Sequence, residues 1–231
     1  MDRIFSSFQK ALQLIVSLNR ELADIVVLSL CVSVTAILVA SLFGIAFAYY
    51  LSFKRFPLRG FITSVLNTFM GLPPVVVGLV LYLFLSRSGP LGFMSLLYTP
   101  SVMVIAQIIL AFPIVSAMSH AAIVSVDPNI KLAARGLGST EIQASFAVLK
   151  DARYGIISSI MAGLGRVMAE VGAVLIVGGN IAGYTRVMTT TIALEYDKGN
   201  FELAIAIGII LLVISLILNS TLYLFQRREV R

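Results

Sequence analysis

Few side chains in this sequence of 231 residues have the type and the neighbours that chemistry requires. The only cysteine, Cys31, lies in the middle of one apolar run, and the only histidine, His120, lies in another. One thiol cannot form a disulfide framework or a metal cluster, and this imidazole has no nucleophile or second ligand near it. We therefore expect no catalytic residue, no metal site and no cofactor in this chain, and a packing or hydrogen-bonding role for His120.

One pair of opposite charges lies deep inside an apolar segment. Arg166 and Glu170 are four residues apart, a spacing that places both on one face of a helix. Arg166 lies roughly 20 Å beyond Arg153 along a helix, where a lone arginine costs roughly 2.5–3.5 kcal/mol on insertion scales. We therefore expect Arg166 to pair with Glu170. Such a pair lines a pathway or latches two conformations, or else it is a structural salt bridge; both interpretations fit the sequence.

Further polar residues follow this pair. Asn180, Arg186 and residues 189–191, all threonines, carry donors suited to an oxyanion, although residues 188–198 also fit a solvated connecting helix. Residues 178–185 have the glycine and threonine spacing of a phosphate-binding loop, but tyrosine stands where that motif requires lysine. We therefore expect no nucleotide site there.

The elements that hold these residues need a membrane around them. Mean hydropathy is +1.00 and only 12% of the residues are charged, too few for the surface of a soluble domain. A helix needs about 20 apolar residues to cross a bilayer. Five segments meet this length, and the predicted spans are residues 25–53, 60–86, 101–123, 154–177 and 203–225. The predicted fold is therefore all-α, a polytopic membrane protein with five transmembrane helices.

The second predicted span contains a helix-breaking pair of residues. Pro73 and Pro74 follow Gly71, and proline removes a backbone donor. Carbonyls freed inside a membrane must be satisfied by neighbouring helices or by a water-filled path. The expected kink therefore either borders a pathway or is purely structural.

Lysines and arginines near the ends of the spans predict the orientation. The loops on the side of the C-terminus hold ten of them and the opposite side holds six. By the positive-inside rule the C-terminus is cytoplasmic and the N-terminus lies outside. Basic residues beside apolar spans also account for the net charge of +6, so we expect no nucleic-acid partner.

Short segments flank the spans at both ends. Apolar residues recur at helical spacing from Ile4 to Leu18, so residues 1–23 are predicted to form an amphipathic helix on the membrane surface. A short extra span is the alternative. Residues 24–226 then form one transmembrane domain, and residues 227–231 form a cytoplasmic tail.

The longest cytoplasmic connection, residues 126–153, has the signals of two short helices. Asp127 can cap the first helix, with Pro128 at its first position, and the helix is expected to stop at Gly138. The resulting bend at a glycine makes a compact unit on the cytoplasmic face.

The second short helix is expected to begin behind Ser139 or Thr140, because Thr140 and Gln143 have capping-box spacing. In the first helix, the small residues Ala133 and Ala134 would let the bent unit press closely into the groove of a partner. The alternative is an ordered connecting loop without a partner.

The segment DPNIKLAARGLGSTEIQASF, residues 127–146, resembles the coupling loop, called the EAA loop, of binding-protein-dependent ABC permeases of type I importers. In that family the loop docks into the ATPase subunit and transmits its closure to the spans. Two alanines and a glycine match the family at the expected spacing, whereas Leu132 replaces its glutamate and its later proline is absent. The resemblance implies an ATPase-coupling loop that contains Asp127, Ala133, Ala134, Gly138 and Ser139.

The stretch from 163 to 200 is similar to the permeases of tungstate importers, which are relatives of molybdate and sulfate permeases. The resemblance covers essentially the whole chain beyond the N-terminal helix. It implies an inner-membrane permease for tungstate, with molybdate, sulfate or phosphate as alternatives in the same role. The candidates for its pathway or gate are Pro73, Pro74, Arg166, Glu170 and Asn180.

The resemblance also implies partners. These are a pair of ATP-binding subunits on the cytoplasmic side, an extracytoplasmic substrate-binding protein, and a second permease copy, since one five-span subunit encloses no obvious path. ATP hydrolysis is expected on the separate subunit, so this chain is not an enzyme. An ion-coupled secondary transporter is the rival, but Glu170 is the only acidic residue deep in a span. A membrane enzyme would need a catalytic cluster that the sequence lacks.

Overall fold

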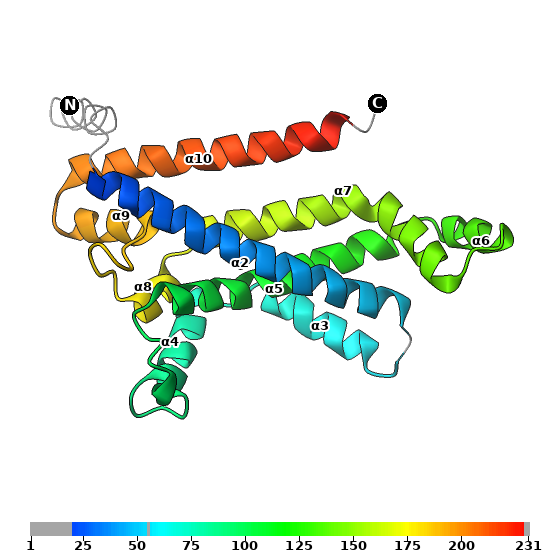
Figure 1. The fold of residues 1–231 in the computed structure, drawn as a ribbon, viewed down its shortest axis with the longest axis horizontal. Helices are drawn as coiled ribbons and strands as arrows, with labels where there is room; N and C mark the ends of the chain where they lie inside the picture. The colour runs from blue at the N-terminus through cyan, green and yellow to red at the C-terminus, as the bar shows by residue number, and fades with distance from the viewer. Residues whose placement is uncertain (1–19, 55, 229–231) are drawn as a thin grey trace.

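The computed structural model describes residues 20–54 and 56–228, and the regular elements of this part of the chain are all helical. They are α2 (Arg20–Phe53), α3 (Arg59–Phe69), α4 (Pro74–Leu85), the 3₁₀ turn η1 (Gly92–Met94), α5 (Pro100–Val124), α6 (Pro128–Gly136), α7 (Glu141–Met168), α8 (Gly172–Gly178), α9 (Met188–Asp197) and α10 (Phe201–Arg228). Helices α2, α5, α7 and α10 lie roughly along the long axis of the molecule, with α6 at one end and α9 at the other (Figure 1). The predicted all-α class is confirmed.

The predicted spans correspond to three straight helices and two broken ones. Helices α2 and α5, with 34 and 25 residues, and the segment Phe201–Thr221 of α10 are each long and apolar enough to cross a bilayer. The other two candidate spans are bent pairs, α3 with α4 at 101° and α7 with α8 at 56°. The N-terminal surface helix predicted for residues 1–23 lies outside the described residues, except that residues 20–23 open α2.

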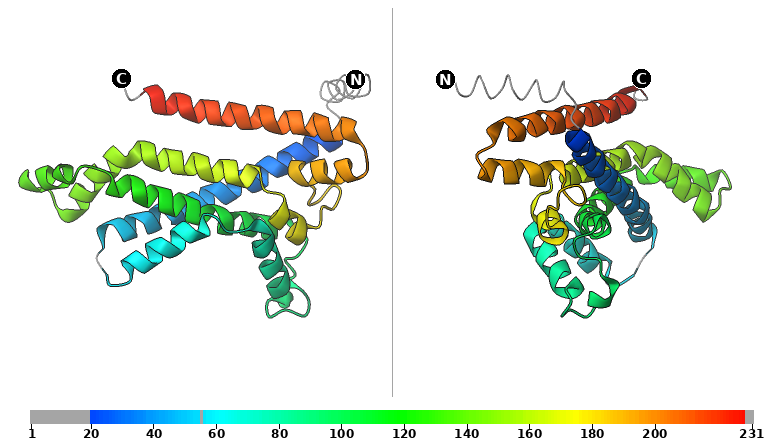
Figure 2. Two further views of the ribbon diagram at one scale, coloured as in Figure 1. Left: turned by 180° about the vertical axis from the view of Figure 1, so that it is seen from behind. Right: turned by 60° about the vertical axis from the view of Figure 1, so that its left-hand side comes forward.

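The first break is the one that the double proline predicts, but it is a sharp turn and not a mild kink. Pro73 precedes α4 in an extended conformation, and Pro74 occupies the first position of that helix. Proline at this position has no donor to lose, so it starts α4 without a penalty. The turn directs residues 72–98 away from the long axis of the molecule as a projecting hairpin, on the side of the molecule opposite α10 (Figure 2).

The second break corrects the sequence-based prediction of one continuous span over residues 154–177. Helix α7 ends at Met168, and the chain bends before α8 begins at Gly172. Across the interface, α8 packs tightly against α4. A Cβ added at Gly172 would lie 2.8 Å from Val75 Cγ2, and one added at Gly78 would lie 2.9 Å from the Ala173 backbone. The two broken spans thus interlock through glycines.

A tightly packed core holds the straight helices together. Ala36, Ala40 and Ala111 are fully buried where α2 and α5 meet, and Val115 joins them. A Cβ added at Gly44 would approach Val115 to 3.1 Å. Small residues at such an interface let helices approach closely in lipid, where dispersion drives association.

Substitution of Gly78 tests the contact between the broken spans. We expect Gly78→Ala to destabilise the protein by about 1–3 kcal/mol, because its methyl group would overlap the backbone of α8. Thermal unfolding of the purified protein in detergent measures this effect. Gly208→Ala on α10 is the matched control, because a Cβ added there meets nothing within 4 Å. Equal unfolding temperatures for the two variants would contradict the close approach of α4 and α8.

Candidate functional site

Helices α6 and α7 form an elbow (residues 127–146) whose caps agree with the sequence. The Asp127 carboxylate accepts a hydrogen bond from Asn129 N at 2.9 Å. Thr140 and Gln143 form the predicted capping box, with Thr140 N donating to Gln143 Oε1 at 2.9 Å and Gln143 N donating to Thr140 Oγ1 at 3.4 Å. Gly138 has a φ of +85°, a left-handed conformation that favours glycine.

The second helix of the elbow is not short, which corrects the prediction. Helix α7 starts at Glu141 and continues for 28 residues into the fourth span without a break. The capping box therefore begins the span itself. Helix α6 ends at Gly136, and the turn is closed by Ser139 N, which donates to Ala134 O at 3.1 Å.

Two exposed ion pairs that sequence reasoning missed connect α6 to the start of α7. Glu141 Oε1 lies 2.7 Å from Arg135 Nη1, and Glu141 Oε2 lies 3.0 Å from Lys131 Nζ. The hydrogen bond from Lys131 and the charge of Arg135 hold the pKa of Glu141 below its ordinary value. Lys131 also lies over the Phe53 ring, 5.3 Å from its centroid, at the end of α2. The only sequence signal was opposite charge on either side of the bend.

The outer face of the elbow is apolar and exposed. Ala133 is exposed and Ala134 is half-buried, and larger apolar side chains surround them. These side chains have exposed fractions between 63% and 89%, and they are Leu132, Leu137, Ile142 and Phe146. Helix α6 lies at one end of the molecule (Figure 1). An exposed apolar patch around small residues has the character of a docking surface.

The two helix breaks meet at a second site. Arg166 Nη2 donates to the carbonyl oxygen of Leu72 at 3.3 Å, directly before Pro73 and Pro74. The arginine thus satisfies a carbonyl at the break between α3 and α4. Three of the five pathway candidates, Arg166 and the two prolines, lie together here.

The predicted pair between Arg166 and Glu170 does not form in this structure. Because α7 ends at Met168, Glu170 lies in the bend, and the spacing of a continuous helix no longer applies. Glu170 is 4% exposed, and its Oε1 accepts a hydrogen bond from Ala173 N at 2.9 Å at the start of α8. Within residues 20–54 and 56–228, Arg166 has no carboxylate at ion-pair distance.

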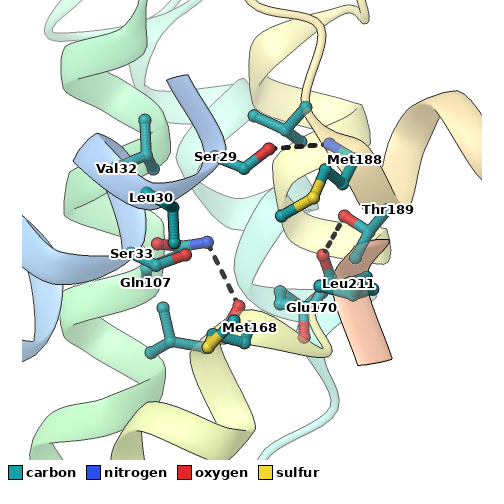
Figure 3. A pocket seen from close by; sticks show the side chains of 12 residues that line it. Ser29, Leu30, Val32, Ser33, Gln107, Met168, Glu170, Met188, Thr189 and Leu211 are labelled. Carbon is teal, nitrogen blue, oxygen red and sulfur yellow. Dashed lines mark hydrogen bonds between the residues drawn. The ribbon is translucent and has the colours of Figure 1, made fainter. Parts of the chain in front are cut away.

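A small cavity with polar and apolar lining lies beside Glu170, where α2, α5, α9 and α10 converge on the bend (Figure 3). Gln107 Nε2 donates to the carbonyl of Val167 at 3.3 Å, while its Oε1 is buried without a hydrogen bond. Thr189 Oγ1 donates to the backbone carbonyl of Glu170 at 2.7 Å, and Ser29 Oγ accepts from Met188 N at 2.7 Å. The cavity measures only about 20 Å³, so it belongs to the packing of the bend and not to a substrate path.

The fifth candidate, Asn180, lies in the turn after α8 and is held by α9. Its Oδ1 accepts a hydrogen bond from Thr190 Oγ1 at 2.9 Å, and its Nδ2 donates to Thr190 O at 3.4 Å. Thr190 and Thr191 are both 1% exposed, so α9 is a packed helix and its hydroxyls do not face an incoming anion. The expected role of Asn180 in a pathway stays a prediction.

The isolated histidine and cysteine have separate environments. His120 is buried, and its Nδ1 lies 2.8 Å from Ser52 Oγ, which agrees with the expected packing and hydrogen-bonding role. Cys31 is exposed on α2. The part of the chain that the structure covers contains no group of three possible metal ligands.

Comparison with known proteins gives one family and full-length relatives. The family described as binding-protein-dependent transport system inner membrane component matches residues 25–231. The tungstate uptake system permease protein of Peptoclostridium acidaminophilum is 37% identical over 226 residues, 98% of this chain and 99% of the relative. The probable anion ABC transporter permease protein of Haloferax volcanii is 43% identical over 204 residues, 86% of this chain and 88% of the relative.

Solved structures show the same fold at lower identity. A bacterial alginate ABC transporter in complex with an alginate pentasaccharide-bound periplasmic protein matches with a TM-score of 0.76 and 19% identity. The match covers 100% of this chain and 88% of that chain.

Neutralising Glu141 tests the ion pairs of the elbow. We expect a spin label at the half-buried Ala134→Cys, in a Cys31→Ser background, to be less mobile at neutral pH than the same label after Glu141→Gln, which should be mobile at every pH. With Glu141 intact, the lowered pKa means that the pairs persist above the ordinary pKa of glutamate and are lost as the pH falls through the lowered value. Asp151→Asn, an exposed acid farther along α7, is the control. Equal label mobility with and without Glu141 would show that its ion pairs do not hold α6 against α7.

Proposed function

Because the chain belongs to the family of binding-protein-dependent transport system inner membrane components, we propose that it is the permease subunit of an ATP-driven ABC importer, with tungstate as its substrate. The elbow of α6 and α7 carries this proposal, since it presents an apolar docking surface on the side that is predicted to be cytoplasmic. Two ATP-binding subunits would dock on the elbows of two permease copies. An extracytoplasmic binding protein would deliver the substrate to the opposite side.

The continuity of α7 suggests how ATP hydrolysis moves the pathway. The helix runs from Glu141 in the elbow to Arg166 at the junction of the broken spans, about 37 Å at 1.5 Å per residue. The two ion pairs of Glu141 fix α6 to this helix, so a force on the docking surface acts on the whole of α7. Closure of the ATPases would thus draw the elbows together and shift the junction at the other end. The cavity between two copies would then open outward, and hydrolysis would reverse the change.

Arg166 is the best candidate for contact with the oxyanion on its way. The guanidinium is half-buried, and Gly165 and Ala169 beside it are both exposed, so its face of α7 is open. A cation that a carboxylate neutralises would not attract an anion, whereas Arg166 donates to a carbonyl and keeps its full charge. In a homodimer, two such faces would line one path.

The substrate class follows from the relatives and from this charge. The relatives carry the names of tungstate and anion permeases, and an uncompensated arginine suits any tetrahedral dianion. Molybdate, sulfate or phosphate in the same role is therefore the alternative. Selectivity among these anions would reside mostly in the binding protein.

Reconstitution tests the proposed function. In liposomes that contain the permease, its ATPase and its binding protein, we expect tungstate uptake that requires ATP hydrolysis, with molybdate, sulfate and phosphate as competitors. Gly138→Val should abolish uptake and copurification of the ATPase, because a β-branched residue does not tolerate a φ of +85°. Gly60→Val, at an unobstructed position of α3, is the control. Uptake driven by a proton gradient without ATP would contradict the proposal and favour a secondary transporter.

Loss of the Arg166 charge tests its contact with the substrate. Glutamine can still donate to the Leu72 carbonyl, so Arg166→Gln should preserve assembly while it lowers uptake by about tenfold or more, as expected for the loss of a charge-assisted contact. The matched control is Lys150→Gln, an exposed cation on the same helix. Undiminished uptake by a correctly assembled Arg166→Gln permease would show that Arg166 only closes the helix break.

A further inference from the structure

The tip of the projecting hairpin contains an open cleft that the proposed mechanism does not use. The cleft has a volume of about 600 Å³, within the range of small-molecule sites. Its polar lining, here called the Arg87 cup, consists of Tyr82, Ser86, Arg87, Ser88, Ser95 and Tyr98. By the predicted orientation, the cup lies on the outer side of the membrane.

The charge of the cup is unusual for this chain. Arg87 is the only charged residue between positions 60 and 126. No aspartate or glutamate lines the cleft, and the described residues provide no ion-pair partner for Arg87. A single positive charge without a nearby carboxylate favours binding of an anion. It disfavours binding of a cation, or of a protein surface that presents both acidic and basic side chains.

Hydroxyl groups surround this charge. Three serines and two tyrosines line the cleft. Ser86 Oγ lies 3.3 Å from Leu83 O, to which it donates, and 3.3 Å from Ser88 Oγ, whereas no hydrogen bond within the described residues occupies the Ser95 hydroxyl. Partial burial, the charge of the neighbouring Tyr82 and a hydrogen bond with the Tyr82 side chain raise the pKa of Tyr98. The cup therefore offers neutral donors around one guanidinium, a set that matches the acceptor-only surface of a tetrahedral oxyanion.

The loop that forms the cup is held rigidly. Gly89 and Gly92 lie so close to the end of α4 that a Cβ at either would overlap a backbone carbonyl oxygen. Leu91 N donates to Phe84 O at 2.9 Å and Ser86 N donates to Tyr82 O at 2.8 Å, so these helix-end carbonyls, which would repel an anion, are already bonded. On the return strand of the hairpin, Tyr98 N donates to Val177 O at 2.8 Å.

We propose that the Arg87 cup is a receiving site for the tetrahedral oxyanion, at which the binding protein hands over its ligand before the anion reaches Arg166. This inference rests on the proposed function and adds a second binding site to it. The fork of the guanidinium would hold two oxygens of the anion and the serine hydroxyls would hold the others. The phosphate of a lipid headgroup offers the same chemistry, and the experiment distinguishes the two sources.

The test compares tungstate uptake by Arg87→Gln and wild-type permease in reconstituted liposomes at saturating loaded binding protein. We expect uptake to fall about tenfold, as the loss of a charge-assisted contact implies, while binding-protein docking stays unchanged in a pull-down. Arg20→Gln, which removes an exposed positive charge on the same predicted side, should leave both unchanged. If Arg87→Gln does not assemble, Arg87→Lys is tested in its place. Lysine keeps the positive charge but loses the two-pronged guanidinium, so its uptake should be lower than that of the wild type by less than about tenfold.

Three outcomes would overturn the inference. Normal uptake by a folded Arg87 variant would show that the cup does not receive substrate. An equal loss of docking and uptake would make Arg87 a contact of the binding protein. A loss of thermal stability in liposomes with full uptake per folded permease would assign the cup to a lipid headgroup. Failure of the wild-type permease to take up any oxyanion would instead refute the proposed function. This outcome differs from the three above, in which the wild-type permease takes up tungstate.

Discussion

A helix that breaks inside a bilayer exposes backbone groups that lipid cannot satisfy, and this constraint organises the whole molecule. Two spans break close to each other and pack together at their breaks. Arg166, near the end of α7, donates to the Leu72 carbonyl that the double proline frees, and Gly78 and Gly172 let the second halves of the spans lie in contact. The bend that carries Glu170 is in turn fixed by Thr189 of α9. The candidate pathway is therefore a direct consequence of how the breaks are stabilised.

Local signals predicted much of this structure. Long apolar runs predicted α2, α5 and α10, Asp127 and Thr140 predicted where helices begin, and the prolines predicted the first break. The family suggested by the alanines and glycine of the elbow is confirmed. These features depend on neighbours in the chain, or on a motif whose spacing is itself a local property.

The features that escaped prediction depend on residues far apart in the sequence. The second break has no proline, and Gly172 acquires its meaning only from Val75 on α4. The pairing of Arg166 with Glu170 assumed a continuous helix, whereas α7 ends at Met168. Glu141 joins Lys131 and Arg135 only after the chain has turned at Gly138. The threonines of α9 looked like free donors because nothing in the sequence shows that the bend and Asn180 need their hydroxyls.

The uninterrupted course of α7 fixes an angular relation between its two functional ends. Glu141 and Arg166 are 25 positions apart, which is about seven helical turns, so their side chains point in nearly the same direction around the helix axis. A rotation of α7 about this axis would therefore turn the elbow and the Arg166 guanidinium through the same angle. The docking surface and the candidate anion contact thus keep a fixed angle to each other around the helix axis. An insertion of two residues between Glu141 and Arg166 would place their side chains on nearly opposite sides of α7.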